Sequence, residues 1–63
     1  MKTISYICWQ DEEYYIGYLV DYPDYLTQGK TKEELIENLK DLIKDIDSGE
    51  IPHIRKVEEL ELA

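Results

Sequence analysis

The side chains that can support chemistry in this sequence are mainly carboxylates, and they gather in two short stretches. One is Asp11–Glu13, between two aromatic-rich runs, and the other is Asp21 and Asp24, which flank Tyr22-Pro23. Converging carboxylates can hold the metal ions of a nuclease. Asp is also a common turn residue, which explains the second pair without a metal. We expect turns at both places, with no catalytic site and no metal site.

The other reactive residue types are too few or wrongly spaced for an active site. Cys8 and His53 are the single cysteine and the single histidine, so they form neither an internal disulfide nor a zinc ligand set. The tripeptide Gly29-Lys30-Thr31 is similar to the end of a phosphate-binding loop, but Asp24 stands where the earlier glycine is needed. We therefore expect no enzymatic activity and no cofactor.

Composition limits the classes of partner. The chain has 15 acidic and 7 basic residues and a net charge of -8. Phosphate binding depends on Lys and Arg, so direct contact with nucleic acid through this domain is not expected. An acidic surface suits a basic protein, although it also keeps a small domain soluble. No signal segment and no apolar run of about 18 residues occurs, which predicts a cytoplasmic protein without membrane contact.

Alternation and turn residues predict three strands in the first half of the chain. Runs of β-branched and aromatic residues indicate strands over Thr3–Trp9 and Tyr14–Val20, separated by the polar Gln10–Glu13. Pro23 is expected to end the second strand, and a short third strand is predicted over Asp24–Gln28.

One helix and a last strand are predicted in the second half. Thr31 and Glu34 have the spacing of a capping box, and apolar residues then recur at helical intervals until Ser48-Gly49. Gly49 suits the left-handed residue that ends a helix. The broken alternation of Ile54–Leu62 predicts a fourth strand with a bulge.

These elements predict one α+β domain over residues 1–63 with the order β-β-β-α-β. A right-handed crossover through the helix places the last strand parallel to the first and gives the sheet order 3-2-1-4. One helix covers one face of that sheet. Gly17, in the middle of a strand, indicates the close approach of another group, such as the helix.

The sheet has more apolar surface than one helix can cover. A chain of 63 residues is marginally stable alone, and an uncovered apolar face usually marks an interaction site. We expect a homo-oligomer, most simply a two-fold dimer, with self-association through Trp9, Tyr15 and Tyr18. The alternative is that the tyrosines furnish a small core that has no Phe.

The motif pattern resembles the N-terminal domain of the HicB-like antitoxins of type II toxin–antitoxin systems. The likeness runs from Ile4 to about Val57 and depends on these matches: Gly17, Asp21, Pro23, Thr27, Gly29, Thr31, Glu33, Glu34 and Asn38. Several of these matches are turn and cap residues that any such fold needs. The residues with an expected structural role are Gly17, Pro23, Gly29, Thr31, Glu34 and Gly49. The family's usual glycine after the proline is Asp24 here, and its usual helix alanine is replaced by Leu35-Ile36.

The resemblance implies a truncated ribonuclease-H-like fold and a binding function. Members of this family neutralise a small basic mRNA-cleaving toxin, HicA, by covering its surface. The expected contact residues are acidic or aromatic: Asp11, Glu12, Glu13, Tyr14, Asp21, Tyr22, Asp24 and Tyr25. Many members continue into a C-terminal DNA-binding segment, and this sequence has none up to Ala63, so operator binding is not expected.

Two other functions remain open at this point. One is a stand-alone oligomeric module of the same fold that binds a different partner. The other is a metal-dependent nuclease on the ribonuclease-H-like scaffold, which would need a convergent set of carboxylates.

Overall fold

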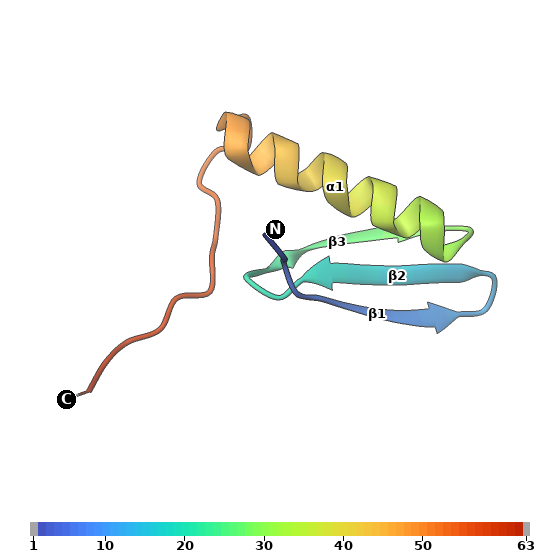
Figure 1. Cartoon of the computed structure of the whole chain (residues 1–63), viewed down its shortest axis with the longest axis horizontal. Helices are drawn as coiled ribbons and strands as arrows, with labels where there is room; N and C mark the ends of the chain where they lie inside the picture. The colour runs from blue at the N-terminus through green and yellow to red at the C-terminus, as the bar shows by residue number, and fades with distance from the viewer. Residues whose placement is uncertain (1, 63) are drawn as a thin grey trace.

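A computed structural model describes residues 2–62 as a three-stranded sheet crossed by one helix (Figure 1). The strands are β1 (Tyr6–Asp11), β2 (Tyr14–Leu19) and β3 (Tyr22–Gly29), and the helix is α1 (Lys32–Ser48). Both strand pairs are antiparallel, and the sheet order is β1-β2-β3. The predicted α+β class, with one helix on one face, is confirmed.

A tight turn joins β1 to β2. Asp11 pairs with Tyr14, so only Glu12 and Glu13 lie between the strands, and Glu12 adopts a positive φ of 56°. The ladder therefore continues into residues that were predicted as a polar break. At the other end β1 begins at Tyr6 rather than at Thr3, because Tyr6 already pairs with Leu19, the last residue of β2.

The third strand is longer than the sequence suggested. β3 begins at Tyr22, and Pro23 lies inside it instead of ending β2, which stops at Leu19. A proline is tolerated here because β3 is an edge strand, where half of the backbone groups face away from the ladder. The pairing of β2 with β3 also shifts register between Gly17 and Leu19.

The N-terminal cap of α1 confirms the role predicted for Thr31 and Glu34. The Thr31 hydroxyl accepts a hydrogen bond from the Glu34 N–H at 3.1 Å. The Glu34 carboxylate accepts from the Lys30 N–H at 3.4 Å, one residue before the cap. Together these bonds satisfy backbone donors that have no partner within the helix.

The C-terminal end of α1 confirms the role predicted for Gly49, whose φ is 76°. Its N–H donates to the Ile46 carbonyl at 3.2 Å, and the Glu50 N–H donates to the Asp45 carbonyl at 3.3 Å. This pair of bonds is the Schellman arrangement, which favours a residue without a side chain at the left-handed position.

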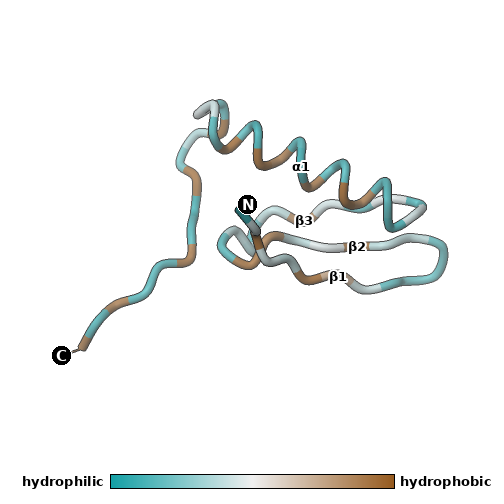
Figure 2. Tube along the Cα trace, in the orientation of Figure 1, coloured by the Kyte–Doolittle hydropathy of each residue, from teal (hydrophilic) through white to brown (hydrophobic). Residues whose placement is uncertain are grey.

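A small core lies between α1 and the sheet. Leu19, Leu35 and Leu39 are its buried residues, and Figure 2 shows the hydrophobic positions of α1 on the side toward the strands. Gly17 and Gly29 permit this contact: a Cβ on Gly17 would lie 3.3 Å from the Leu35 Cδ2, and one on Gly29 would lie 2.6 Å from the Leu35 nitrogen. The predicted close approach at Gly17 is confirmed.

The helix sits off-centre on the sheet. Its backbone approaches β3 and β2, whereas within residues 2–62 it does not come near β1. The flank of α1 over β1 is therefore not covered by another element of the described chain.

The predicted fourth strand is wrong for this chain as described. Residues 54–62 form no strand, so the order 3-2-1-4 is not present, and the segment leaves the body of the molecule (Figure 1). Two hydrogen bonds hold its first part: the Arg55 N–H donates to the Tyr25 hydroxyl at 3.0 Å and the Val57 N–H to the Asp21 carbonyl at 2.6 Å. A strand forms only where a neighbouring strand accepts its backbone bonds, and this segment has none beside it.

Candidate protein-interaction surface

One face of the sheet is apolar and uncovered. Cys8 and Gly17 pair beneath the helix, so the side chains of their neighbours in each strand point to the opposite side. We call this side the open face, and it is made of the following residues: Ile7, Trp9, Tyr14, Ile16 and Tyr18. The cross-strand pairs Ile7–Tyr18 and Trp9–Ile16 make it continuous across β1 and β2.

The open face has the properties of a contact surface rather than of isolated exposed residues. Ile7 is 44 % exposed, Trp9 42 % and Tyr14 38 %. The Trp9 and Tyr18 rings meet edge to face, with centroids 6.1 Å apart and planes at 71°. Such a pair holds both rings in fixed positions, which lowers the entropy lost when a partner binds.

The three residues predicted for self-association do not all lie on the open face. Trp9 and Tyr18 do, but Tyr15 pairs with Gln10 on the helix side and packs against the core. Its place follows from strand alternation, since Tyr15 is one residue out of phase with Tyr18. The same alternation identifies Ile7 and Ile16, which the sequence-based set of self-association residues omitted.

The predicted partner-binding residues fall into two clusters at opposite ends of the sheet (Figure 1). One cluster is Asp11–Glu13, the end of β1 and the turn after it, which we call the acidic tip, and Tyr14 begins β2 beside it. Asp21 lies in the β2–β3 turn, and Tyr22–Tyr25 begin β3. A strand of six residues spans about 20 Å, so the two clusters form no single patch.

The cluster at the start of β3 already has internal partners. Tyr22 packs against the core, so it is a poor contact residue for another protein. Asp24 makes an ion pair with Arg55 at 3.5 Å, and the Tyr25 hydroxyl accepts from the Arg55 N–H. Both partners of the ion pair are exposed to solvent, which makes it weak. These residues hold the first part of the C-terminal segment.

The remaining reactive residues are placed apart from one another. Cys8 is half-buried under the helix, and His53 lies in the turn after it, with a φ of 52°. Among residues 2–62, no group of three or more His, Cys, Asp or Glu is positioned to share a metal ion. The described part of the chain also has no helix that is long and apolar enough to cross a bilayer.

Comparison with known proteins adds no further restraint on function. No protein-family model, curated protein or solved structure matches this chain. The functional argument therefore depends on the open face, the acidic tip and the C-terminal segment.

Proposed function

We propose that this chain is an acidic protein-binding module that self-associates and neutralises a small basic mRNA-cleaving protein by covering its surface. The observation that supports it most directly is the open face of Trp9, Tyr18 and their neighbours, which no element of the described chain covers. The net charge of -8 and the likeness to HicB-like antitoxins favour a basic toxin of the HicA type as the partner.

Self-association is proposed through the open face. Burying about 400 Å2 of apolar surface on each copy contributes about 10 kcal/mol per copy before the entropy costs of association. That is comparable to the whole stability expected of a small domain. A two-fold arrangement places Trp9 and Tyr18 of the two copies against each other and leaves the acidic tips exposed.

The acidic tip is proposed as the main contact for the basic toxin. Asp11, Glu12 and Glu13 are exposed, and within residues 2–62 none of them forms an ion pair. Three adjacent carboxylates with free solvent around them attract a basic surface and speed its association.

The four-stranded ribonuclease-H-like order 3-2-1-4 is proposed for the oligomer and not for the single chain. This order needs the C-terminal segment beside β1, and the single chain does not place it there.

Replacing Trp9 with lysine is expected to halve the mass of the protein in sedimentation equilibrium. The lysine removes the edge-to-face pair and places a charge in the centre of the contact. Gln10→Lys is the matched control, since it adds the same charge to the same strand on the other face. Circular dichroism checks that both variants are folded, and an unchanged mass for Trp9→Lys contradicts the open-face contact.

The toxin proposal is tested with a small basic ribonuclease of the HicA type, chosen from any reading frame of that kind that lies beside this gene. We expect the purified chain to co-purify with it and to stop its cleavage of mRNA. Converting Asp11, Glu12 and Glu13 to their amides should slow association roughly tenfold at low salt, because steering is lost. The control removes the same charge from α1 through Glu37→Gln, Asp41→Asn and Asp45→Asn. Absence of inhibition rejects the antitoxin role. The alternative function, a stand-alone oligomeric module, is then favoured, and the open-face contact is unaffected.

A further inference from the structure

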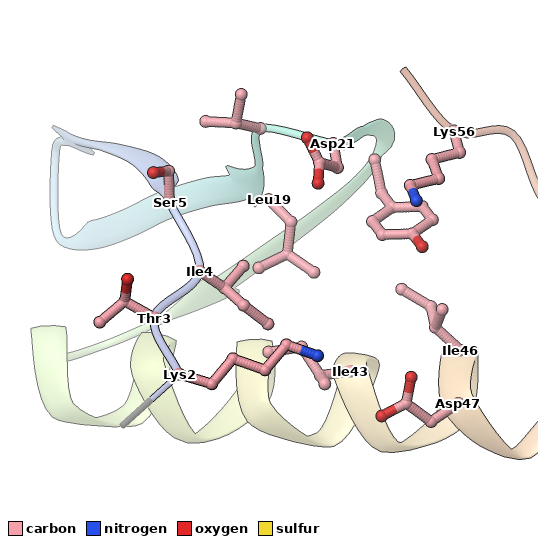
Figure 3. A pocket seen from close by; sticks show the side chains of 12 residues that line it. Lys2, Thr3, Ile4, Ser5, Leu19, Asp21, Ile43, Ile46, Asp47 and Lys56 are labelled. Atoms are coloured by element: carbon pink, nitrogen blue, oxygen red, sulfur yellow. The ribbon is translucent and has the colours of Figure 1, made fainter. Parts of the chain in front are cut away.

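A groove lies between the flank of α1 and the first residue of β1, Tyr6, together with the residues that precede this strand. We call it the edge groove; it has a volume of about 240 Å3, and its lining includes Ile4, Tyr6, Ile36 and Ile43, with Lys2 and Lys40 at its rim. A second cavity of about 560 Å3 adjoins it at the end of the sheet and shares Lys2, Ile4, Leu19 and Ile43. Figure 3 shows Ile4, Leu19 and Ile43 pointing into the space between the strands and the helix.

The edge groove lacks a strand. β1 is the last strand of the sheet on this side, so one row of its backbone N–H and C=O groups faces outward. Above it the side chains are exposed although they are apolar: Ile4 is 42 % exposed and Tyr6 37 %. A fourth strand beside β1 would pair with the backbone row and place alternate side chains under α1.

The C-terminal segment has the chemistry of that missing strand. Leu60 is 83 % exposed and Leu62 87 %, and residues two apart share one face of an extended chain. Glu58 lies on the same face as the two leucines, and its charge complements the two lysines at the rim of the groove, whereas Glu59 and Glu61 lie on the opposite face. Residues 58–62 span about 17 Å when extended, which is close to the length of β1.

The direction of the segment favours the groove of another copy over its own. The Arg55 and Val57 N–H groups are bonded at the β2–β3 end, and beyond them the chain runs away from its own sheet (Figure 1). Reaching its own β1 edge requires a reversal after Val57. Residues 54–62 contain no Gly, Pro, Asn, Asp or Ser, the residue types that make such turns. A second copy can accept the segment without a reversal.

We propose that residues 58–62 of one copy add as a fourth strand beside β1 of a second copy, with Leu60 and Leu62 in its edge groove. The exchange is reciprocal in a two-fold pair, as in domain swapping. It gives the order 3-2-1-4 with the last strand supplied by the partner. The exchange uses a surface different from the open face and depends neither on that contact nor on a toxin.

With both contacts the unsubstituted protein is expected to be a tetramer, so the test is made in the Trp9→Lys background, where the open face no longer associates and the exchanged dimer remains. Leu60→Glu with Leu62→Glu is expected to convert a dimer into a 7.5 kDa monomer in sedimentation equilibrium. Both side chains are almost fully exposed in the single chain, so the substitutions do not disturb its core. Leu60→Met with Leu62→Met keeps the apolar character and is expected to remain dimeric.

Complementation identifies exchange between copies. Ile36→Lys blocks the groove without touching the buried core, so this variant is also expected to be monomeric. A tagged Ile36→Lys copy has an intact C-terminal segment, and an untagged Leu60→Glu, Leu62→Glu copy has an intact groove. Mixed, they should co-purify as a one-to-one pair. Failure to pair, or a Leu60→Glu, Leu62→Glu variant that melts earlier while its mass stays unchanged, overturns the proposal.

Discussion

Replacing Leu35 with alanine is expected to remove most of the stability of the fold. Leu35 is 0 % exposed and is one of three buried apolar residues among residues 2–62, so few neighbours can close the space that it leaves. Such truncations cost about 2–5 kcal/mol, depending on how far the site collapses. A domain of this length is marginally stable, and a loss of about 3 kcal/mol therefore unfolds a large fraction of it.

Urea unfolding followed by circular dichroism measures this effect. The protein concentration must be kept low and equal, because self-association adds stability by mass action. Leu35→Met keeps the volume and is expected to cost less than about 1.5 kcal/mol. Ile36→Ala, on the uncovered flank of α1, is the positional control. A Leu35→Ala midpoint equal to that of Ile36→Ala would show that the leucine core does not determine stability.

The helix was predictable because its signals are local. Thr31 and Glu34 act within one turn of each other, and Gly49 acts on the carbonyls of the turn before it. The presence of β1, β2 and β3 also followed from alternation and turn residues, but their ends did not. Asp11 joins the ladder because Tyr14 pairs with it, which its own residue type does not indicate, and Tyr22 joins through Leu19 although Pro23 follows it.

The candidate surface was only partly predictable, for two different physical reasons. The separation of the two acidic clusters follows from the topology, since successive turns of an antiparallel meander lie at opposite ends of the sheet. Tyr15 can be placed under the helix only when the face that α1 covers is known. The close packing of the Leu35 side chain on Gly17 determines that face. A fourth strand forms only beside a neighbouring strand. The periodicity of residues 54–62 does not indicate which chain provides that neighbour.

Replacing Gly17 with alanine is expected to be about as damaging as the loss of Leu35. A Cβ at this position would lie 2.6 Å from the Ile7 carbonyl oxygen and 3.3 Å from both the Cys8 Cβ and the Leu35 Cδ2. The oxygen belongs to the backbone of β1, and the ladder with β2 holds that strand in place. Relief requires the two strands to part or α1 to lift, and overpacking of this kind costs about 3 kcal/mol.

Two comparison variants identify the contact at Gly17 that decides the result. Gly49→Ala places a Cβ where nothing lies within 4 Å, at a φ of 76°, and is expected to cost only about 1 kcal/mol for the left-handed backbone. Gly17→Ala with Leu35→Val removes the Cδ2 contact but leaves the Ile7 oxygen in the way. The double variant should therefore be no more stable than Gly17→Ala in urea unfolding. If Leu35→Val restores stability, the prediction is wrong. The Leu35 side chain then limits the space at Gly17, and the backbone of β1 shifts to admit the new Cβ.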